Sequence, residues 1–451
     1  MIDRVYVARW VLPIATAPIA RGAVAIEDGR IVWVGPVQEA PPGPRIDLGD
    51  CALTPGLVNV HAHLELTPMR GWLEDLPFRQ WILRLTKTRE ATMTEARRLA
   101  AARVGLAEGL LAGITTWADV SDSGVSLDAM VSMGVRGIVF REVFGPDPAQ
   151  CPSAIGALRT QVESMRARST DLVSVGVSPH APYTVSDALF RATASLALDD
   201  GYPLTVHVAE GAAEDALVRA GSGEFAEAWR ARGIAVSPRA RSPIALLHDT
   251  GILVTRPLLV HAVRADAADV ALVRDSGSRV AHCPASNAKL GHGIAPLLEL
   301  RAAGVPVGLG SDSVASSNRV DLLDEARVAA FQQRVRLGRP DALSAGEALR
   351  MATLGGAESL GMGQAIGALV PGLAADLVAF PLDGVGDVPV HAPEPALVFG
   401  AAGRRARFVT VAGRELVRDG ALLADIRADV AVVHEAALAL AEPVLAASAV
   451  R

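Results

Sequence analysis

The sequence predicts an α/β protein built on a (β/α)8 barrel, and three observations support this fold class. Between Thr54 and Leu369, apolar runs alternate with helical stretches. Each of the eight runs is apolar on both faces, as parallel strands covered on both sides are. The segment is also long enough for eight strand–helix units with insertions. We therefore assign residues 54–368 to the barrel.

Eight strands are predicted along this segment, with helices between them. The clearest helix runs from Thr92 to Leu111, where Thr92 and Glu95 form a candidate capping box and apolar residues fall mainly on one side. The stretch from Gly211 to Leu258 is longer than one helix needs, which predicts an insertion. The predicted strands are TPGLVNVHAH, GITTWADV, RGIVFREVFG, DLVSVGVSPH, PLTVHVAE, PLLVHAV, SRVAHCPAS and VPVGLGSDS.

Both ends of the chain contain short strands and turns. Residues 1–53 include VYVARWVLP and GAVAIEDGRIVWVG, in which Glu27–Arg30 is a hairpin signal. Residues 369–423 repeat this pattern in AADLVAF and RFVTVAGRELVRDG. Because the termini of a compact unit often lie together, we expect the two ends to form one small sheet domain. The alanine-rich residues 424–451 are expected to form a C-terminal helix.

Composition argues against several functional classes. The net charge of −6 predicts no attraction to nucleic-acid phosphates. No run of ~20 uncharged apolar residues is present, so no membrane span is expected. The three cysteines lie far apart without a CxxC pair, which argues against a disulfide framework or a cysteine zinc site. With no recognisable signal peptide, a cytoplasmic location is expected.

Histidines gather where the predicted strands end. Such ends form the active-site face of a barrel, so residues distant in sequence converge there. Taken singly, each histidine fits a core or supporting role, but together they indicate an active site. The group comprises His61, His63, His180, His207 and His261, together with Asp312 after the eighth strand.

The spacing of His61 and His63 indicates a metal site. Residues i and i+2 on a strand project from the same face, so both imidazoles can reach one ion. His207 and Asp312 would complete a set of three nitrogens and one oxygen, which suits Zn²⁺ or Fe²⁺. Such a set leaves a position for water, as a catalytic site requires. We expect one divalent ion, with zinc as the first choice.

Six segments, in order, resemble the signatures of the amidohydrolase superfamily, especially its purine and nucleoside deaminases and triazine hydrolases. They are PGLVNVHAHLELT, SPHAPY, TVHVAEG, LVHAV, HCPASNAKLGHG and GLGSDSVASSN. The resemblance implies metal ligands at His61, His63, His207 and Asp312, and a small β-sandwich domain made from the two chain ends.

The resemblance also implies a mechanism. Glu210 would be the general acid that protonates a ring nitrogen, His261 would position the attacking water, and Asp312 would accept its proton. Binuclear relatives carry a carboxylated lysine at the end of strand four, where this chain reads SPHAPY, so a single ion is implied. Ammonia would then leave from the ring carbon.

The substrate is less clearly indicated. LELTPMRGWLEDLPFRQWI, FREVFGPDPA and SDSVASSN resemble aminodeoxyfutalosine deaminases, whereas adenosylhomocysteine deaminases more often show Asp-Gly at Asp312-Ser313. Each candidate contact also has a structural reading, as a surface carboxylate, a packed aromatic ring or a salt bridge. The candidate substrate contacts are Glu65, Trp72, Arg141, His180 and Ser313.

Motifs typical of other functional classes are incomplete or absent in the sequence. His63-Leu64-Glu65 matches the HxE of cytidine-deaminase-type enzymes, but their PCxxC partner is absent. The glycines near residue 361 lack the dinucleotide-binding spacing, and no P-loop is present. The remaining alternatives are hydrolysis of a C–Cl bond or a cyclic amide in a small heterocycle, and a non-catalytic scaffold barrel. A small-molecule substrate is expected, and a homodimer is the candidate assembly.

Overall fold

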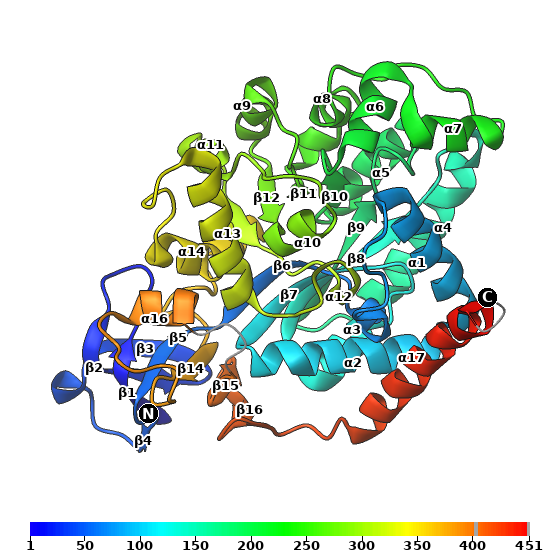
Figure 1. Ribbon diagram of the computed structural model, residues 1–451. Helices are drawn as coiled ribbons and strands as arrows, with labels where there is room; N and C mark the ends of the chain where they lie inside the picture. Colours follow the sequence, from blue (N-terminus) through cyan, green and yellow to red (C-terminus); the bar gives the residue numbers. More distant parts are fainter. Residues whose placement is uncertain (401–404, 449–451) are drawn as a thin grey trace.

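The computed structural model describes residues 1–400 and 405–448 (Figure 1). Its central part contains two four-stranded parallel sheets, ordered β6-β7-β8-β9 and β10-β11-β12-β13, with helices outside them. All eight predicted strands are present. They are β6 (Leu57–Ala62), β7 (Ile114–Ser121), β8 (Arg136–Val143), β9 (Val173–Pro179), β10 (Thr205–Val208), β11 (Leu258–His261), β12 (Arg279–His282) and β13 (Val307–Leu309).

The two sheets meet at both of their edges. A parallel bridge joins Val177 of β9 to Leu204, just before β10. A second bridge joins Ala62 of β6 to Asp312, just after β13. Because all eight strands run in one sense, these contacts bring their carboxyl ends to one face, where the histidines lie.

Helices follow most of the strands, and the predicted insertion is confirmed as a group of short helices before β11. That group contains α6 (Ala212–Ala220), α7 (Gly223–Ala231), α8 (Pro243–Asp249) and the 3-10 helix η4 (Ile252–Thr255). The remaining α-helices are α1 (Phe78–Thr92), α2 (Glu95–Leu111), α3 (Ser126–Met133), α4 (Cys151–Arg166), α5 (Asp187–Asp200), α9 (Ala267–Ser276), α10 (Pro284–Lys289), α11 (Leu297–Ala302), α12 (Val314–Ser317), α13 (Leu322–Leu337), α14 (Ala345–Met351), α15 (Leu354–Ser359), α16 (Pro393–Gly400) and α17 (Arg427–Ser448). Further 3-10 turns are η1 (Val37–Glu39), η2 (Leu64–Met69) and η3 (Pro148–Gln150).

The predicted start of the long helix is wrong by two residues. Thr92 is the last residue of α1, and its hydroxyl donates to the Thr88 carbonyl at 2.7 Å. Thr94 caps α2 instead, where its hydroxyl accepts from the Arg97 amide at 3.3 Å. Thr92 does not cap α2 because it is still part of the preceding helix α1.

The two chain ends meet in one nine-stranded sheet, as the repeated strand pattern predicted. Its main order is β17-β16-β15-β14-β5-β1-β2-β3, with β4 paired to β1, and the antiparallel pair β5–β14 joins the two ends of the chain. The predicted hairpin turn is confirmed at Asp28 and Gly29, which both have positive φ (48° and 71°). The strands are β1 (Arg4–Val11), β2 (Ile19–Glu27), β3 (Arg30–Pro36), β4 (Arg45–Asp47), β5 (Cys51–Pro55), β14 (Leu377–Pro381), β15 (Phe408–Val411), β16 (Arg414–Arg418) and β17 (Ala421–Leu422).

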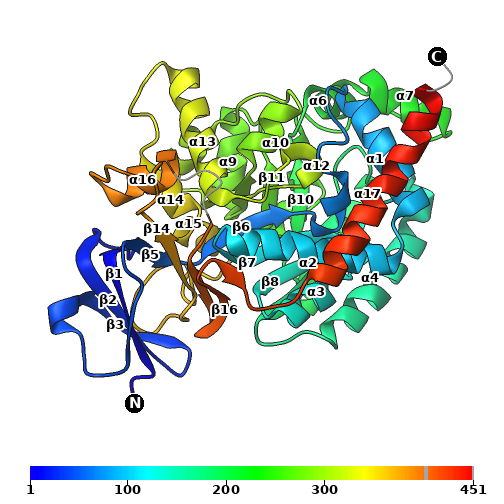
Figure 2. The same ribbon diagram turned by 60° about the horizontal axis from the view of Figure 1, so that its bottom comes forward.

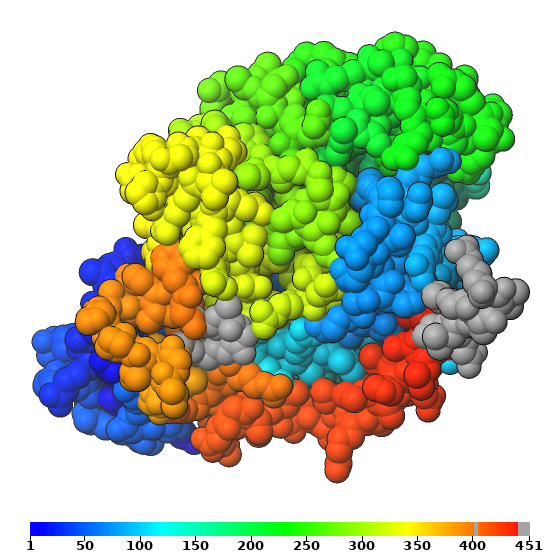
Figure 3. Space-filling view, in the orientation of Figure 1, coloured from blue at the N-terminus to red at the C-terminus, as the bar shows by residue number. Residues whose placement is uncertain are grey.

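The C-terminal helix α17 lies against α1 and α2, outside the parallel sheets and away from the end sheet (Figure 2). It follows the lower edge of the molecule in the space-filling view (Figure 3). Ala436 and Leu440 are buried in a cluster that includes Trp81 of α1. The predicted helix extended to residue 451, and its last three residues lie outside the described part. No described helix is long and apolar enough to cross a membrane.

Candidate metal centre

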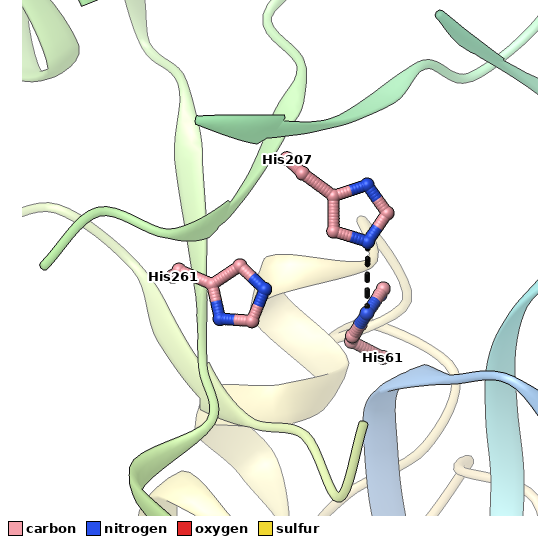
Figure 4. Close-up of side chains that lie close together, drawn as sticks. All are labelled: His61, His207 and His261. Atoms are coloured by element: carbon pink, nitrogen blue, oxygen red, sulfur yellow. Dashed lines mark hydrogen bonds between the residues drawn. The ribbon is translucent and has the colours of Figure 1, made fainter. Parts of the chain in front are cut away.

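Three imidazoles and one carboxylate converge at the carboxyl ends of the parallel strands. The Nε2 atom of His207 lies 3.3 Å from Nε2 of His61 and 3.3 Å from Nε2 of His63. The Oδ1 atom of Asp312 lies 3.5 and 3.6 Å from the Nε2 atoms of His61 and His63. Figure 4 shows a ring nitrogen of His207 directed at a ring nitrogen of His61, with His261 beside them. The four residues assigned to the metal are therefore close together.

The Nδ1 contacts of His63 and His207 determine which ring nitrogen of each residue is free to bind a metal ion. Nδ1 of His63 faces the Val120 carbonyl at 3.2 Å, and Nδ1 of His207 faces the His180 carbonyl at 3.0 Å. A carbonyl only accepts, so each Nδ1 carries the proton and each Nε2 turns a lone pair toward the centre. Burial and the neighbouring imidazole of His61 lower the pKa of His63 to about 4 and that of His207 well below its usual value.

These lone pairs make the fit to a cation specific. Two neutral nitrogens 3.3 Å apart, with no proton between them, repel each other unless a positive ion lies in reach of both. Ligand imidazoles must be neutral, and their outer N–H groups are commonly held by carbonyls, as those of His63 and His207 are. The donor set therefore fits one divalent ion.

Asp312 is held by several hydrogen bonds. Its Oδ2 accepts from the hydroxyls of Ser286 (2.5 Å) and Ser316 (3.0 Å), and its Oδ1 accepts from the Ser313 amide at 2.7 Å. Asp312 and His261 both have positive φ, 54° and 75°, which costs a residue with a side chain about 1–3 kcal/mol. This strain occurs where the strands end and side chains turn toward the centre.

His261 and Glu210 lie at one side of the metal ligands. Nδ1 of His261 faces the Asn287 carboxamide oxygen at 3.0 Å, so its Nε2 is left to face Oε1 of Glu210 at 3.6 Å. Both residues are buried. The Glu214 carboxylate accepts from the backbone amides of Ala209 and Glu210, at 3.0 and 2.8 Å, which fixes the backbone at the proposed acid.

Two residues close to Glu210 were not predicted from the sequence. The Tyr183 hydroxyl donates to Oε2 at 3.2 Å, and Nε2 of His292 lies 3.3 Å from Oε1. Burial alone would raise the pKa of Glu210, but His261 and His292 hold it below its ordinary value. His292 belongs to the segment HCPASNAKLGHG and Tyr183 to SPHAPY, so both lay within recognised motifs without a strand-end position to mark them.

A cavity of about 780 Å³ opens onto these residues. Its lining includes the metal ligands His63, His207 and Asp312. It also includes aromatic and aliphatic side chains from α1 and α7. Those side chains are Phe78, Trp81, Ile82, Leu83, Phe225 and Trp229. The site can thus hold a heterocycle at the ligands and an apolar substituent further out.

Two predicted substrate contacts, His180 and Ser313, line this cavity. Three others lie outside its lining, each with a structural partner. The Glu65 carboxylate accepts from Ser121, Ser123 and Arg98, and it is only 5% exposed.

The ring of Trp72 is covered by the Arg84 guanidinium, 4.3 Å from the ring centroid. Arg141 donates to the carbonyls of Ser121 and Glu142, at 3.4 and 3.0 Å. Period-two spacing suggested that Glu65 would share a face with His63. The chain leaves the strand after Ala62 and enters η2, so this spacing does not apply.

The chain belongs to the amidohydrolase family, whose model matches residues 52–416. It is 34% identical over 409 residues to a protein of Syntrophobacter fumaroxidans named 5-methylthioadenosine/S-adenosylhomocysteine deaminase, covering 89% of each chain. Among solved structures, it resembles a zinc-bound adenosine deaminase from Xanthomonas campestris (TM-score 0.87, 29% identity, 97% and 98% coverage). It also resembles the zinc complex of an atrazine chlorohydrolase from Arthrobacter aurescens (TM-score 0.84, 27% identity, 96% and 100% coverage).

Proposed function

We propose that the protein is a metal-dependent aminohydrolase that removes ammonia from an adenosine-type nucleoside. The observation that carries the proposal is the Glu210 carboxylate beside His261, at the edge of a histidine and aspartate cluster that opens into a large cavity. The deaminase names of the relatives support the same reaction. The apolar side chains in the cavity lining favour a nucleoside with an apolar 5′ substituent, such as 5-methylthioadenosine, over a plain base.

His61, His63, His207 and Asp312 would hold the ion, with Zn²⁺ as the proposed metal. The chemistry that a divalent ion supplies to such a donor set is water activation at neutral pH. Asp312 is placed to take a proton from the attacking water, because its carboxylate lies at the centre and its other oxygen is already held by serines. His261, whose Nε2 lies on the side of the site next to Glu210, orients that water.

Glu210 would carry a proton to the substrate. Since its pKa is held low in the free site, Glu210 must first take up a proton from solvent and then deliver it to the ring nitrogen next to the reacting carbon. The proton that Asp312 takes from the attacking water would pass to the amino group, which leaves as ammonia, and the remaining hydroxyl proton would return to solvent. Tyr183 and His292 keep its two oxygens in place during this transfer. General acid–base help of this kind contributes about 10²–10⁴-fold to a rate.

The proposal also includes the architecture. The parallel bridges at both seams support a single closed (β/α)8 barrel over residues 54–368. Residues 1–53 and 369–423 would form the accompanying β-sandwich domain, and residues from 424 onward a separate helix. The joint sheet of the two chain ends supports this division.

The test is ammonia release by the zinc-loaded protein. The substrates are 5-methylthioadenosine, S-adenosylhomocysteine, adenosine, aminodeoxyfutalosine, guanine and cytosine, with a chlorotriazine as the contrasting substrate. We expect turnover of at least one adenosine-type nucleoside and none in a His207→Ala control. Chloride release from the triazine, without ammonia release from any nucleoside, would replace the proposal by the C–Cl hydrolase reading.

A further inference from the structure

Glu142 is a buried acid in the cavity that the proposed mechanism does not use. It lies near the end of β8, lines the cavity, and is only 6% exposed. Its Oε1 atom has no hydrogen-bond partner among the residues that the structure describes. A buried polar atom without a partner costs about 1–3 kcal/mol, so an unpartnered acid oxygen on a residue that lines a cavity is a candidate contact for a ligand.

The nearest polar neighbour does not satisfy this oxygen. Nε2 of His180 lies 3.9 Å from Oε1 of Glu142, which is too long for a hydrogen bond. The hydroxyl of Thr184 donates to the Ala181 carbonyl at 3.2 Å and lies 2.6 Å from Nδ1 of His180. The hydroxyl oxygen therefore accepts from Nδ1, and Nε2 keeps a lone pair. Oε1 of Glu142 and Nε2 of His180 thus lie at the cavity without a hydrogen bond to a described residue.

Along the chain, Glu142 on β8 and His180 after β9 precede His207 on β10, and Glu210 follows it. Polar atoms of Glu142, His180 and His207 all lie within 4.8 Å of one another, on the side of β8 and β9. Glu210 pairs with His261 on the side of β11. A substrate ring over the metal ligands would have one edge at Glu210 and another at Glu142.

We propose that Glu142 is a specificity residue that donates a hydrogen bond from its carboxyl group to N7 of a purine. The inference rests on the proposed function. In an adenine ring the amino-bearing carbon has N1 on one side and N7 on the other. If Glu210 serves N1, the group across the site faces N7, which carries a lone pair and requires a donor.

The surroundings of Glu142 keep a donor available. Burial, with a contribution from Asp122, raises the pKa of Glu142 to about 8, so the acid retains its proton near neutrality. The other charged groups near it are Arg89, Arg141 and Glu65, whose effects oppose one another. A monocyclic triazine has no fused five-membered ring to offer N7, so this residue would separate purine substrates from triazines.

The experiment compares a nucleoside with its 7-deaza analogue, in which N7 is replaced by C–H. Steady-state kcat/KM is measured for both in the zinc-loaded wild type, Glu142→Gln and Glu142→Met. The glutamine keeps an N–H donor, and the methionine keeps the volume without one. We expect the wild type and Glu142→Gln to prefer the parent nucleoside by about 10- to 100-fold. Glu142→Met should lose this preference through a poorer rate on the parent alone.

Equal zinc content and thermal midpoints would show that the variants fold, and Glu163→Gln, on an exposed position of α4, serves as the matched control. An unchanged preference in Glu142→Met, alongside normal wild-type turnover, would overturn the role at N7. Absence of turnover of every nucleoside by the wild type would instead overturn the proposed function, and this inference with it.

Discussion

Three imidazoles at the site depend on a partner behind the ring. The carbonyls of Val120 and His180 set the tautomers of His63 and His207, and the Asn287 carboxamide does the same for His261. The two carbonyl partners have no sequence signature, because a backbone carbonyl is available at every position. The ligands themselves could be predicted, since strand-end histidines are rare and their spacing is specific. Their orientation could not be.

At the same scale, we expect His207→Ala to abolish both turnover and metal retention. His207 is the imidazole that lies 3.3 Å from both His61 and His63, so its loss opens the donor set. Metal content after gel filtration and ammonia release are the two measurements. Full zinc content in the variant would show that His207 is not a ligand.

Glu210→Gln separates metal binding from catalysis. The amide preserves size and a hydrogen-bond acceptor for Tyr183, but it cannot carry a proton. We expect zinc content to stay at the wild-type level while kcat falls about 10²–10⁴-fold. Wild-type kcat in this variant would refute the acid role.

At the scale of elements, periodicity predicted the strands themselves better than the boundaries of the elements next to them. All eight strands of the two parallel sheets were predicted because burial on both faces leaves continuous apolar runs. The start of α2 was misplaced because the threonine at 92 already ends α1. The wrong face expected for Glu65 has a similar cause, since η2 interrupts the strand alternation. Predicted boundaries are wrong where a neighbouring element includes the same residues.

Glycine in helices offers a prediction at this scale. A Cβ atom at Gly109 of α2 would lie 2.1 Å from the Trp117 ring, whereas at Gly156 of α4 it would meet nothing within 4 Å. Gly109→Ala should therefore destabilise the fold by about 1–3 kcal/mol through overpacking. Gly156→Ala should stabilise it by about 0.5–1 kcal/mol. Urea unfolding of both variants checks the opposite signs, and equal shifts would contradict the packing argument.

At the scale of the whole molecule, one partly buried ion pair ties the parallel sheet of β8 to the end sheet. Nε and Nη2 of Arg136 on β8 donate hydrogen bonds to the carboxylate of Asp376, just before β14. Asp376 is 3% exposed. Arg136→Leu would leave that carboxylate without its counter-charge and should cost about 3–5 kcal/mol. The exposed pair of Arg159 and Asp200 is the control, and Arg159→Leu should cost under ~1 kcal/mol. Similar losses in both variants would contradict the linking role.

Global stability should also depend on pH through Asp119, a fully buried acid on β7. Burial raises the pKa of Asp119 to about 8, well above the unfolded value of ~3.9. The folded state thus binds this proton more tightly, so its contribution is complete below pH ~4 and is lost as pH rises toward 8. Relative to Asp119→Asn, the wild type should lose stability across that window. Thermal midpoints that run parallel from pH 4 to 8 would refute this.

The meeting of the two chain ends has a consequence for biosynthesis. Strand β5 ends at Pro55, yet its partner β14 begins only at Leu377, so the ribosome must make nearly the whole barrel before the two can pair. At about 5–20 residues per second, the early strands wait for tens of seconds with an unpaired edge. During that interval the nascent chain carries an open template for other strands, which makes translation speed and chaperone access determinants of yield.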